Sequence, residues 1–151
     1  MIKESKTQRT TVVVVGGGQA GLSASHQLCK SGIKHVVLER SKRFHSWKKD
    51  RWDSFCLVTP NWQCRLPEWH YEGDDPNGYM VKDEIVDYLE GFANSFQPPI
   101  HEGVRVTSVE RWSDGKILIN TSETRWIADF VILATGSYDL QLKPDFAKNL
   151  N

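Results

Sequence analysis

Residues 11–39 read TVVVVGGGQAGLSASHQLCKSGIKHVVLE, and the fold class can be predicted from this stretch. Residues 11–15 lack polar alternation, which is typical of a short strand covered on both faces in a parallel sheet. Apolar residues then recur on one face of a predicted helix over 19–30. Residues 33–38 form a second predicted strand, which ends at Glu39. The order predicts a βαβ unit.

The glycine loop between the first strand and the helix has the spacing Gly16-x-Gly18-x-x-Gly21. This spacing, in this context, is the fingerprint of dinucleotide binding. Gly16 permits the tight turn, Gly18 lets a pyrophosphate approach the backbone, and Gly21 lets the helix pack closely on the strand. The N–H groups at the helix start, which include Gln19 and Ala20, would then face the phosphate charge.

Glu39 stands at the end of the second strand, 18 residues after Gly21. A carboxylate there can accept both hydroxyl groups of a ribose. The motif does not choose between FAD and NAD, because both carry an adenosine ribose and a pyrophosphate. NADP is not expected at this first site, since Glu39 would repel its 2′-phosphate.

The rest of the chain is less regular. Residues 40–79 show no clear period and are predicted as a long irregular segment with one short helix. Helical periodicity returns over 82–96. Four strands are predicted after this helix, at 103–112, 116–121, 124–127 and 130–134.

Charge and composition narrow the range of partners. The 19 Lys and Arg residues balance 19 Asp and Glu residues, so the basic excess of a nucleic-acid-binding protein is absent. The longest apolar run, Val12 to Val15, is far shorter than the roughly 20 residues that span a bilayer. Residues 1–10 contain no apolar core of a secretory signal. We therefore expect a small-molecule substrate, with neither nucleic acid nor a membrane as partner.

The three cysteines, Cys29, Cys56 and Cys64, form no Cys-x-x-Cys pair. We expect reduced thiols and a cytoplasmic protein. The five histidines show no metal-ligand spacing, so no metal site is expected. No residue is assigned as a general acid or a nucleophile.

Four of the six tryptophans fall within residues 47–69, and three runs there carry a family resemblance: FHSW at 44–47, RWDS at 51–54 and TPNWQ at 59–63. They resemble the flavin-containing monooxygenase group and its Baeyer–Villiger-type relatives. In that group a Gly-Gly-x-Trp segment runs beside the isoalloxazine ring of FAD. The run Ala134-Thr135-Gly136 resembles the second signature of flavoproteins with two dinucleotide-binding domains. The resemblance covers about residues 10–148 and implies FAD as the cofactor.

The resemblance implies roles near the flavin. Trp47 is a flavin neighbour or a plain packing residue, and the same choice holds for Trp52 and Trp62. Arg51 faces the pyrophosphate or the flavin edge, or forms a surface ion pair. His45-Ser46 stand where glycines usually precede the tryptophan, so the chain departs from the family there.

At the adenosine end, the resemblance implies Arg40 beside the ribose and the backbone of Val106 against adenine. Val106 lies in the run GVRVTSV at 103–109, which matches the strand that passes adenine. The Ala-Thr-Gly run is implied to pass close to the cofactor; the alternative is an ordinary core strand that ends in a turn. Disulfide reductases carry a Cys-x₄-Cys pair in this part of the chain, and the sequence has none.

The expected fold is α/β: a Rossmann-like FAD-binding domain, with a parallel sheet that starts from the βαβ unit and a small antiparallel meander. We expect a disordered tail over 1–10 and an FAD- or NAD(P)-binding domain over 11–151. Full members of the group contain a second GxGxxG loop for NADPH. The sequence lacks this loop, which indicates the N-terminal portion of an incomplete two-dinucleotide-domain flavoprotein, a fragment or a truncated chain.

The resemblance implies that NADPH reduces FAD in the full-length parent, and that the reduced cofactor then uses O₂ to oxygenate an unknown small molecule. The first hypothesis is therefore the FAD-binding portion of a flavin-dependent, NAD(P)H-using monooxygenase-like oxidoreductase. The alternative is a non-catalytic module that holds FAD, NAD or ADP. We expect the chain alone to bind flavin weakly and not to oxidise NADPH.

Overall fold

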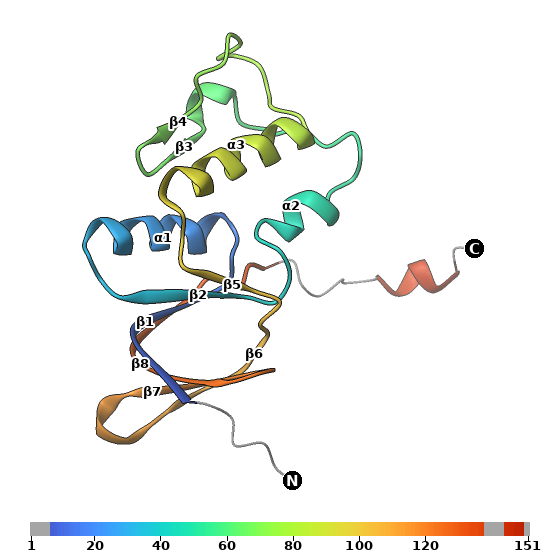
Figure 1. Cartoon of the computed structure of the whole chain (residues 1–151). Coiled ribbons are helices and arrows are strands. Elements are labelled where there is room, and N and C mark those ends of the chain that lie inside the picture. Colours follow the sequence, from blue (N-terminus) through green and yellow to red (C-terminus); the bar gives the residue numbers. More distant parts are fainter. Residues whose placement is uncertain (1–6, 138–143, 150–151) are drawn as a thin grey trace.

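The computed structural model describes residues 7–137 and 144–149. Its centre is a six-stranded sheet (Figure 1), with the strands in this order: β5 (Ile100–Glu102), β2 (His35–Glu39), β1 (Thr7–Val15), β8 (Arg125–Leu133), β7 (Ile117–Thr121) and β6 (Val106–Arg111). The first four strands run parallel, and β7 and β6 run antiparallel to their neighbours. The expected α/β fold, with a parallel sheet and a small antiparallel meander, is confirmed.

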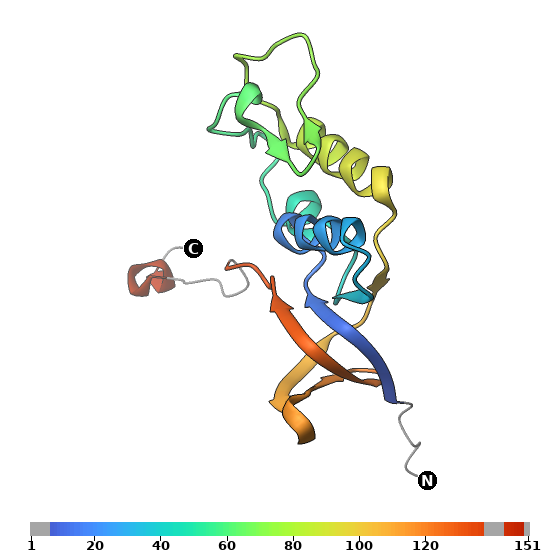
Figure 2. The same cartoon turned by 90° about the vertical axis from the view of Figure 1, so that its left-hand side faces the viewer.

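Three helices accompany the sheet: α1 (Gln19–Lys30), α2 (His45–Lys49) and α3 (Lys82–Phe96). Figures 1 and 2 show α1 along one side of the parallel strands, with α3 beyond α1. The bounds of both long helices agree with the sequence prediction. The smaller elements are β3 (Arg65–Leu66), β4 (Trp69–His70) and the 3₁₀ turns Asn61–Gln63, Ser113–Gly115 and Asp145–Asn149.

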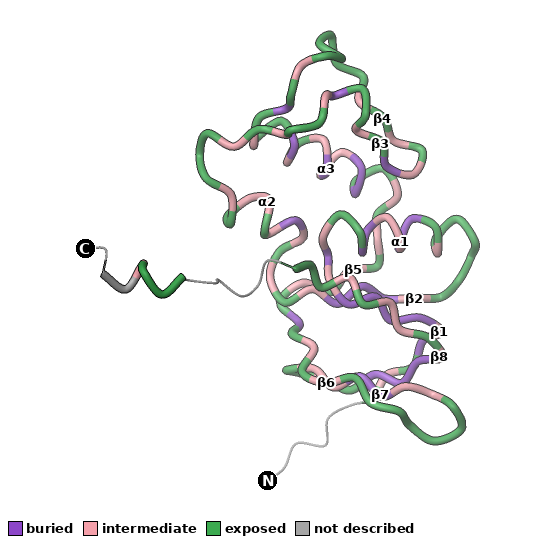
Figure 3. The backbone as a smooth tube through the Cα atoms, turned by 180° about the vertical axis from the view of Figure 1, so that it is seen from behind, coloured by how far each residue is buried: buried purple, intermediate pink, exposed green. Residues whose placement is uncertain are grey.

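Two hydrophobic cores lie on opposite faces of β1, because successive side chains of a strand point to opposite faces. Val12 and Val14 pack with residues of α1 and α3. Val13 and Val15 pack in a second cluster with Ile119 of β7 and other residues. Figure 3 shows buried residues in β1, β2, β7 and β8 and in the helices α1 and α3. The two-sided burial predicted from residues 11–15 is confirmed.

The strand predictions need three corrections. Residues 124–127 and 130–134 are not separate strands, since β8 runs without interruption and pairs with β1 from Arg125 to Leu133. Asp129 lies within β8, whose pairing with β1 continues on both sides of it, and its carboxylate forms an ion pair with Lys116. The predicted strand at 103–112 is shorter, and β5, which the sequence did not reveal, precedes it and pairs with β2.

The N-terminal boundary also differs from the prediction. β1 begins at Thr7, so residues 7–10 belong to the sheet rather than to a tail over 1–10, and they pair with residues 125–128 of β8. Residues 1–6 of the predicted tail, and residues 138–143 and 150–151 of the predicted domain, lie outside the described residues.

The segment 40–81 between β2 and α3 is held by backbone hydrogen bonds between its loops and by side-chain hydrogen bonds rather than by long strand pairings. Asn61 is buried, donates from Nδ2 to the carbonyl oxygen of Asp75 at 2.9 Å, and accepts from the N–H of Met80 at 2.7 Å. The hydroxyl of Tyr88 in α3 lies 3.1 Å from the carbonyl oxygens of Cys64 and Trp69. Burial, with the nearby Cys64 thiol, raises the pKa of Tyr88 to about 12. The expected short helix is present as α2, whereas the β3–β4 hairpin was not predicted.

None of the helices within residues 7–137 and 144–149 has both the length and the apolar character needed to cross a membrane.

Candidate functional site

A cavity of about 590 Å³ opens where the parallel strands β1, β2 and β8 end. The carboxyl ends of parallel strands are where ligands bind in open α/β sheets. Its wall combines the glycine loop, the end of β2, the start of α2 and the residues that follow β8. Twelve of the thirteen candidate residues line it, Gly21 being the exception: Gly16, Gly18, Gln19, Ala20, Glu39, Arg40, Trp47, Arg51, Val106, Ala134, Thr135 and Gly136.

Two of the fingerprint glycines are required by close backbone packing. Gly16 has a φ of 113°, and a Cβ there would overlap the carbonyl oxygen of Ala134. A Cβ on Gly21 would overlap the carbonyl oxygen of Gly16 and lie 3.4 Å from the Cβ of Ala134. The small residue at 134 therefore packs against the glycine loop, so the end of β8 and the start of α1 meet without an intervening side chain.

Gly18 has a different environment. It is the N-cap of α1, with extended backbone, and a Cβ built there would meet no atom within 4 Å. Because Gly18 also lines the cavity, this open space is the room that a close approach of a phosphate to the backbone requires. Gln19 and Ala20 line the cavity in the first turn of α1, where N–H groups have no partner within the helix.

Glu39 ends β2 at the cavity and organises its wall. Its Oε2 accepts from the N–H of Gly17, and its Oε1 from the N–H of Ser41, both at 2.7 Å. An ionised carboxylate offers about four acceptor positions, so hydroxyl groups of a ribose can still bind there. Glu39 thus fixes the glycine loop and the turn after β2 in one arrangement.

Trp47 and Arg51 lie together at the other part of the cavity wall. The guanidinium carbon of Arg51 is 4.9 Å from the ring centroid of Trp47 and 5.4 Å from that of Phe55. Trp47 also makes an edge contact with Phe55, with centroids 6.0 Å apart. Trp47 is therefore both a packing residue and a cavity residue, and Arg51 carries a positive charge at that wall.

Trp52 and Trp62 do not line this cavity. Trp52 is 64% exposed and packs edge-on against Phe55, and Trp62 is 51% exposed. Of the tryptophans in RWDS and TPNWQ, neither is therefore placed to contact a ligand in this cavity.

The structure adds cavity residues that sequence reasoning did not single out. Val104 and Arg105 lie beside Val106, while His45 and Asp50 lie at the two ends of α2. Arg105 lies inside the run GVRVTSV, so the match of this run to the strand that passes adenine is the sequence signal that could have identified it. His45 was noted only as a departure from a glycine pattern, and Asp50 carried no signal.

Phe44, which is buried, has a left-handed backbone with φ of 58°, a conformation that glycine adopts more readily. Its N–H donates to the carbonyl oxygen of Gly17 at 3.1 Å, and its own carbonyl oxygen accepts from Trp47 and Lys48. This residue ties α2 to the glycine loop. Strained backbone of this kind is concentrated at functional sites.

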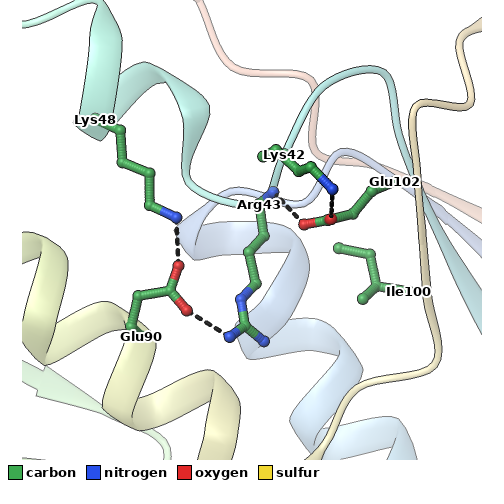
Figure 4. A pocket seen from close by; sticks show the side chains of 6 residues that line it. All are labelled: Lys42, Arg43, Lys48, Glu90, Ile100 and Glu102. Atoms are coloured by element: carbon green, nitrogen blue, oxygen red, sulfur yellow. Dashed lines mark hydrogen bonds and ion pairs between the residues drawn. The ribbon is translucent and has the colours of Figure 1, made fainter.

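A second cavity, of about 450 Å³, is lined mainly by ion-paired side chains from α2 and the turn before it, from α3 and from β5 (Figure 4). Arg43 and Lys48 both pair with Glu90 of α3. Glu102 of β5 accepts from the Nζ of Lys42 at 2.9 Å and from the N–H of Arg43 at 2.8 Å. We call these five residues the charged cluster. It joins α2 and the turn before it to α3 and β5.

The carboxylates of the charged cluster are stabilised as anions. Burial opposes ionisation of Glu90, but hydrogen bonds and charges from Lys48 and Arg43 outweigh it and lower the pKa of this carboxyl. Burial likewise opposes ionisation of Glu102, and the contacts with Arg43 and Lys42 lower its pKa. Every carboxylate of this cavity is thus engaged by two donors from the protein.

Within the described part of the chain, no group of three or more His, Cys, Asp or Glu side chains is arranged to hold a metal ion. The three cysteines, Cys29, Cys56 and Cys64, are free thiols.

The sequence and the fold both match known flavoenzymes. The chain is 36% identical over 140 residues to an uncharacterized oxidoreductase of Geobacillus kaustophilus designated CzcO-like, across 93% of this chain and 40% of that protein. It is 31% identical to YUCCA9, a probable indole-3-pyruvate monooxygenase of Arabidopsis thaliana, across 88% of this chain and 33% of that one. The flavin-containing monooxygenase of Stenotrophomonas maltophilia superposes with a TM-score of 0.81 at 28% identity, across 91% of this chain and 42% of that structure.

These matches confirm the resemblance to flavin monooxygenases that the tryptophan-rich runs carry. The chain spans about two fifths of the first of these relatives and a third of the second. The sequence model described as pyridine nucleotide-disulphide oxidoreductase matches residues 13–149, nearly the whole chain. The chain belongs to the pyridine nucleotide-disulphide oxidoreductase family, and flavin monooxygenases are among its relatives.

Proposed function

We propose that this chain is the FAD-binding portion of a flavin-dependent, NAD(P)H-using monooxygenase-like oxidoreductase that acts on a small molecule. One observation carries the proposal: a single cavity at the carboxyl ends of β1, β2 and β8 collects the fingerprint loop, Glu39 and the residues after β8. A catalytic residue is not assigned, because bound FAD itself supplies the redox chemistry and the protein supplies position and electrostatics.

The cavity residues fit FAD at its adenosine and diphosphate parts. The backbone N–H groups at Gly18, Gln19 and Ala20 would hold the diphosphate, in the open space above Gly18. Glu39 would accept the ribose hydroxyls. The backbone of Val106, at the start of β6, would contact adenine, with Arg40 beside the ribose.

The wall formed by the end of β8 is less complete. Leu133 is 67% exposed, and Thr135 and Gly136 are exposed as well. At the adenosine part, by contrast, Leu38 and Val104 are buried wall residues. Because affinity depends on how fully a ligand is enclosed, we propose that the chain alone holds adenosine better than isoalloxazine and does not oxidise NADPH.

The proposal is tested by titrating the purified chain with ADP, followed by calorimetry, and with FAD, followed by flavin fluorescence and absorbance. Gly18→Val should abolish binding of both, because its branched side chain would occupy the phosphate position. Gln27→Val, on the exposed side of α1, is the matched control and should bind as the original chain does. Equal binding by Gly18→Val and the original chain would contradict the site assignment.

The alternative is a nucleotide-binding module without chemistry, and a separate measurement distinguishes it. Supplying NADPH and oxygen to the FAD-loaded chain tests turnover directly. Steady NADPH consumption with FAD binding at micromolar concentration or tighter would contradict the weak flavin binding proposed for the chain alone. ADP binding with no preference for FAD in a longer form of the protein would favour the alternative module.

We further propose a cytoplasmic setting, a small-molecule substrate, and NADPH as the reductant of the complete protein. The three free thiols support a reducing compartment. The relatives named as monooxygenases support the reaction class.

A further inference from the structure

His45 places an imidazole in the cavity wall at a position where the family pattern has glycine. It is the first residue of α2 and lines the cavity together with Asp50, which follows the last turn of this helix. The Nε2 of His45 lies 4.0 Å from the Oδ1 of Asp50, and both side chains are partly exposed. A glycine offers only backbone there, so His45 adds a group that can carry charge.

The position of His45 is fixed relative to the glycine loop. The preceding residue, Phe44, donates its N–H to the carbonyl oxygen of Gly17 at 3.1 Å, so His45 begins one residue from a direct contact with the loop. The N–H of His45 donates to the carbonyl oxygen of Lys42 at 3.1 Å, which closes the turn before α2, and His45 is one of the residues that line the cavity. The wall that carries His45 therefore stands beside the loop that would hold a diphosphate.

We propose that His45, oriented by Asp50, is a diphosphate-binding residue of this cavity, and that its protonated form supplies charge to the ligand. The inference rests on the proposed function. A dinucleotide diphosphate is doubly anionic, and helix N–H groups supply only partial positive charge. An imidazolium within reach adds a charge-assisted hydrogen bond. Binding then strengthens as pH falls through the range in which an imidazole gains its proton.

Several other charged groups lie around His45 or share the cavity wall with it. On its own segment, Lys48 pairs with Glu90 of α3, and the guanidinium of Arg51 lies over Trp47 and Phe55. Glu39 faces the cavity from β2 and accepts two backbone N–H groups. The other charged residues that line the cavity are these: Arg40, Asp50 and Arg105. Arginine and carboxylate side chains ordinarily keep their charge near neutral pH. A change of ligand affinity in this pH range is therefore attributed to an imidazole.

The test measures the dissociation constant of ADP-ribose from about pH 8 to about pH 6, where imidazole titrates. ADP-ribose is a diphosphate diester, so its own charge is constant in this range, and neutral adenosine is the control ligand. We expect roughly a five- to tenfold gain in affinity on acidification for the original chain. His45→Gln should remove this gain, and Asp50→Asn should reduce it, because the imidazole loses the neighbour that orients it. His70→Gln, an exposed histidine outside the cavity, should change nothing.

The outcomes separate the inference from the function on which it rests. ADP-ribose binding that is flat with pH, or equally pH-dependent in His45→Gln, would overturn the role of His45 and leave the dinucleotide site intact. An adenosine affinity that follows the same pH profile would also overturn it. Absence of ADP-ribose binding by the original chain at every pH would overturn the proposed function and the inference together.

Discussion

The strands and helix of residues 7–39 differ from the segment 40–81 in what holds them together. The first region is a ladder of parallel backbone pairings, with Val13, Val14 and Leu22 fully buried. The second has only two-residue strands. It is held by loop hydrogen bonds, by Asn61, by the charged cluster and by fewer buried apolar side chains, which are Phe44, Leu66 and Met80. It also exposes large apolar side chains: Trp52, Val58, Trp62 and Tyr79.

This comparison indicates which part of the cavity wall is rigid and which part can change its conformation. The glycine loop and Glu39 come from the first region, and Trp47 and Arg51 come from the second. Segments with few buried apolar contacts open at lower free energy than core strands. We therefore expect the glycine loop and Glu39 to keep their geometry when the wall near Trp47 loosens.

The largest expected effect comes from Gly21→Val. The new side chain would overlap the carbonyl oxygen of Gly16, a backbone atom that cannot rotate away. We expect the free energy of unfolding to fall by more than about 3 kcal/mol, measured by urea denaturation. Gly18→Val is the control and should cost less than about 1 kcal/mol, because a Cβ meets nothing there. Equal losses would mean that the close packing of loop and strand is not what requires Gly21.

A second variant, Asn61→Ala, should act on segment 40–81 alone. It removes two hydrogen bonds and leaves the N–H of Met80 without its acceptor, which costs about 2 kcal/mol. Hydrogen exchange should become faster in 55–81 and stay unchanged in β1 and β2. Asn77→Ala, an exposed residue of the same segment, should leave the exchange pattern as it is. Faster exchange across the whole sheet would show that the two regions unfold together.

Acid should loosen the charged cluster before it unfolds the sheet. The pKa values of Glu90 and Glu102 lie below their ordinary range because their cationic partners outweigh the effect of burial. A carboxyl whose folded pKa is lowered contributes stability at higher pH, and this contribution is lost as pH falls through the folded pKa. The loss is about 1 kcal/mol for a partly exposed pair. The rate of limited proteolysis within 40–81, measured as a function of pH, tests this expectation. In the double variant Glu90→Gln, Glu102→Gln this rate should depend less on pH.

The smallest effect is expected for Trp62→Ala. Trp62 is half-exposed and lies outside the cavity, so unfolding free energy should change by less than about 1 kcal/mol and ADP affinity by less than about twofold. Trp47→Ala, by contrast, removes the contacts with Phe55 and Arg51 and should weaken FAD binding. Equal effects on FAD binding would mean that the tryptophan-rich segment acts as one unit.

The sequence predicts elements well where one physical signal dominates. Apolar periodicity located α1 and α3, and the unbroken run Val12 to Val15 indicated two-sided burial. It failed at β5, because three residues after two prolines are too few to show a period, and that strand exists only through its pairing with β2. The sequence also failed between the predicted strands 124–127 and 130–134, because the pairing of β8 with β1 continues on both sides of the polar Asp129.

The residues of the candidate site also divide into those that a local sequence signal predicts and those that it does not. The glycine spacing and Glu39 are local in sequence, so the motif placed them at one end of the sheet. Asp50 and Arg105 reach the cavity only because α2 docks on the glycine loop and β5 pairs with β2. No spacing in the sequence encodes such a docking, and the left-handed backbone of Phe44 that produces it is unusual for a bulky residue.

The atoms around each glycine of the loop predict whether a second substitution can compensate for the replacement of that glycine. At Gly16 and Gly21 the obstacle to a side chain is backbone, so no compensating substitution elsewhere can restore these positions. At Gly17 the nearest obstacle is the Cδ1 of Ile100, at 2.9 Å, with Glu39 Cβ next at 3.0 Å. A genetic screen that starts from Gly17→Ala should therefore recover shorter residues at position 100, whereas a screen that starts from Gly21→Val should return only revertants.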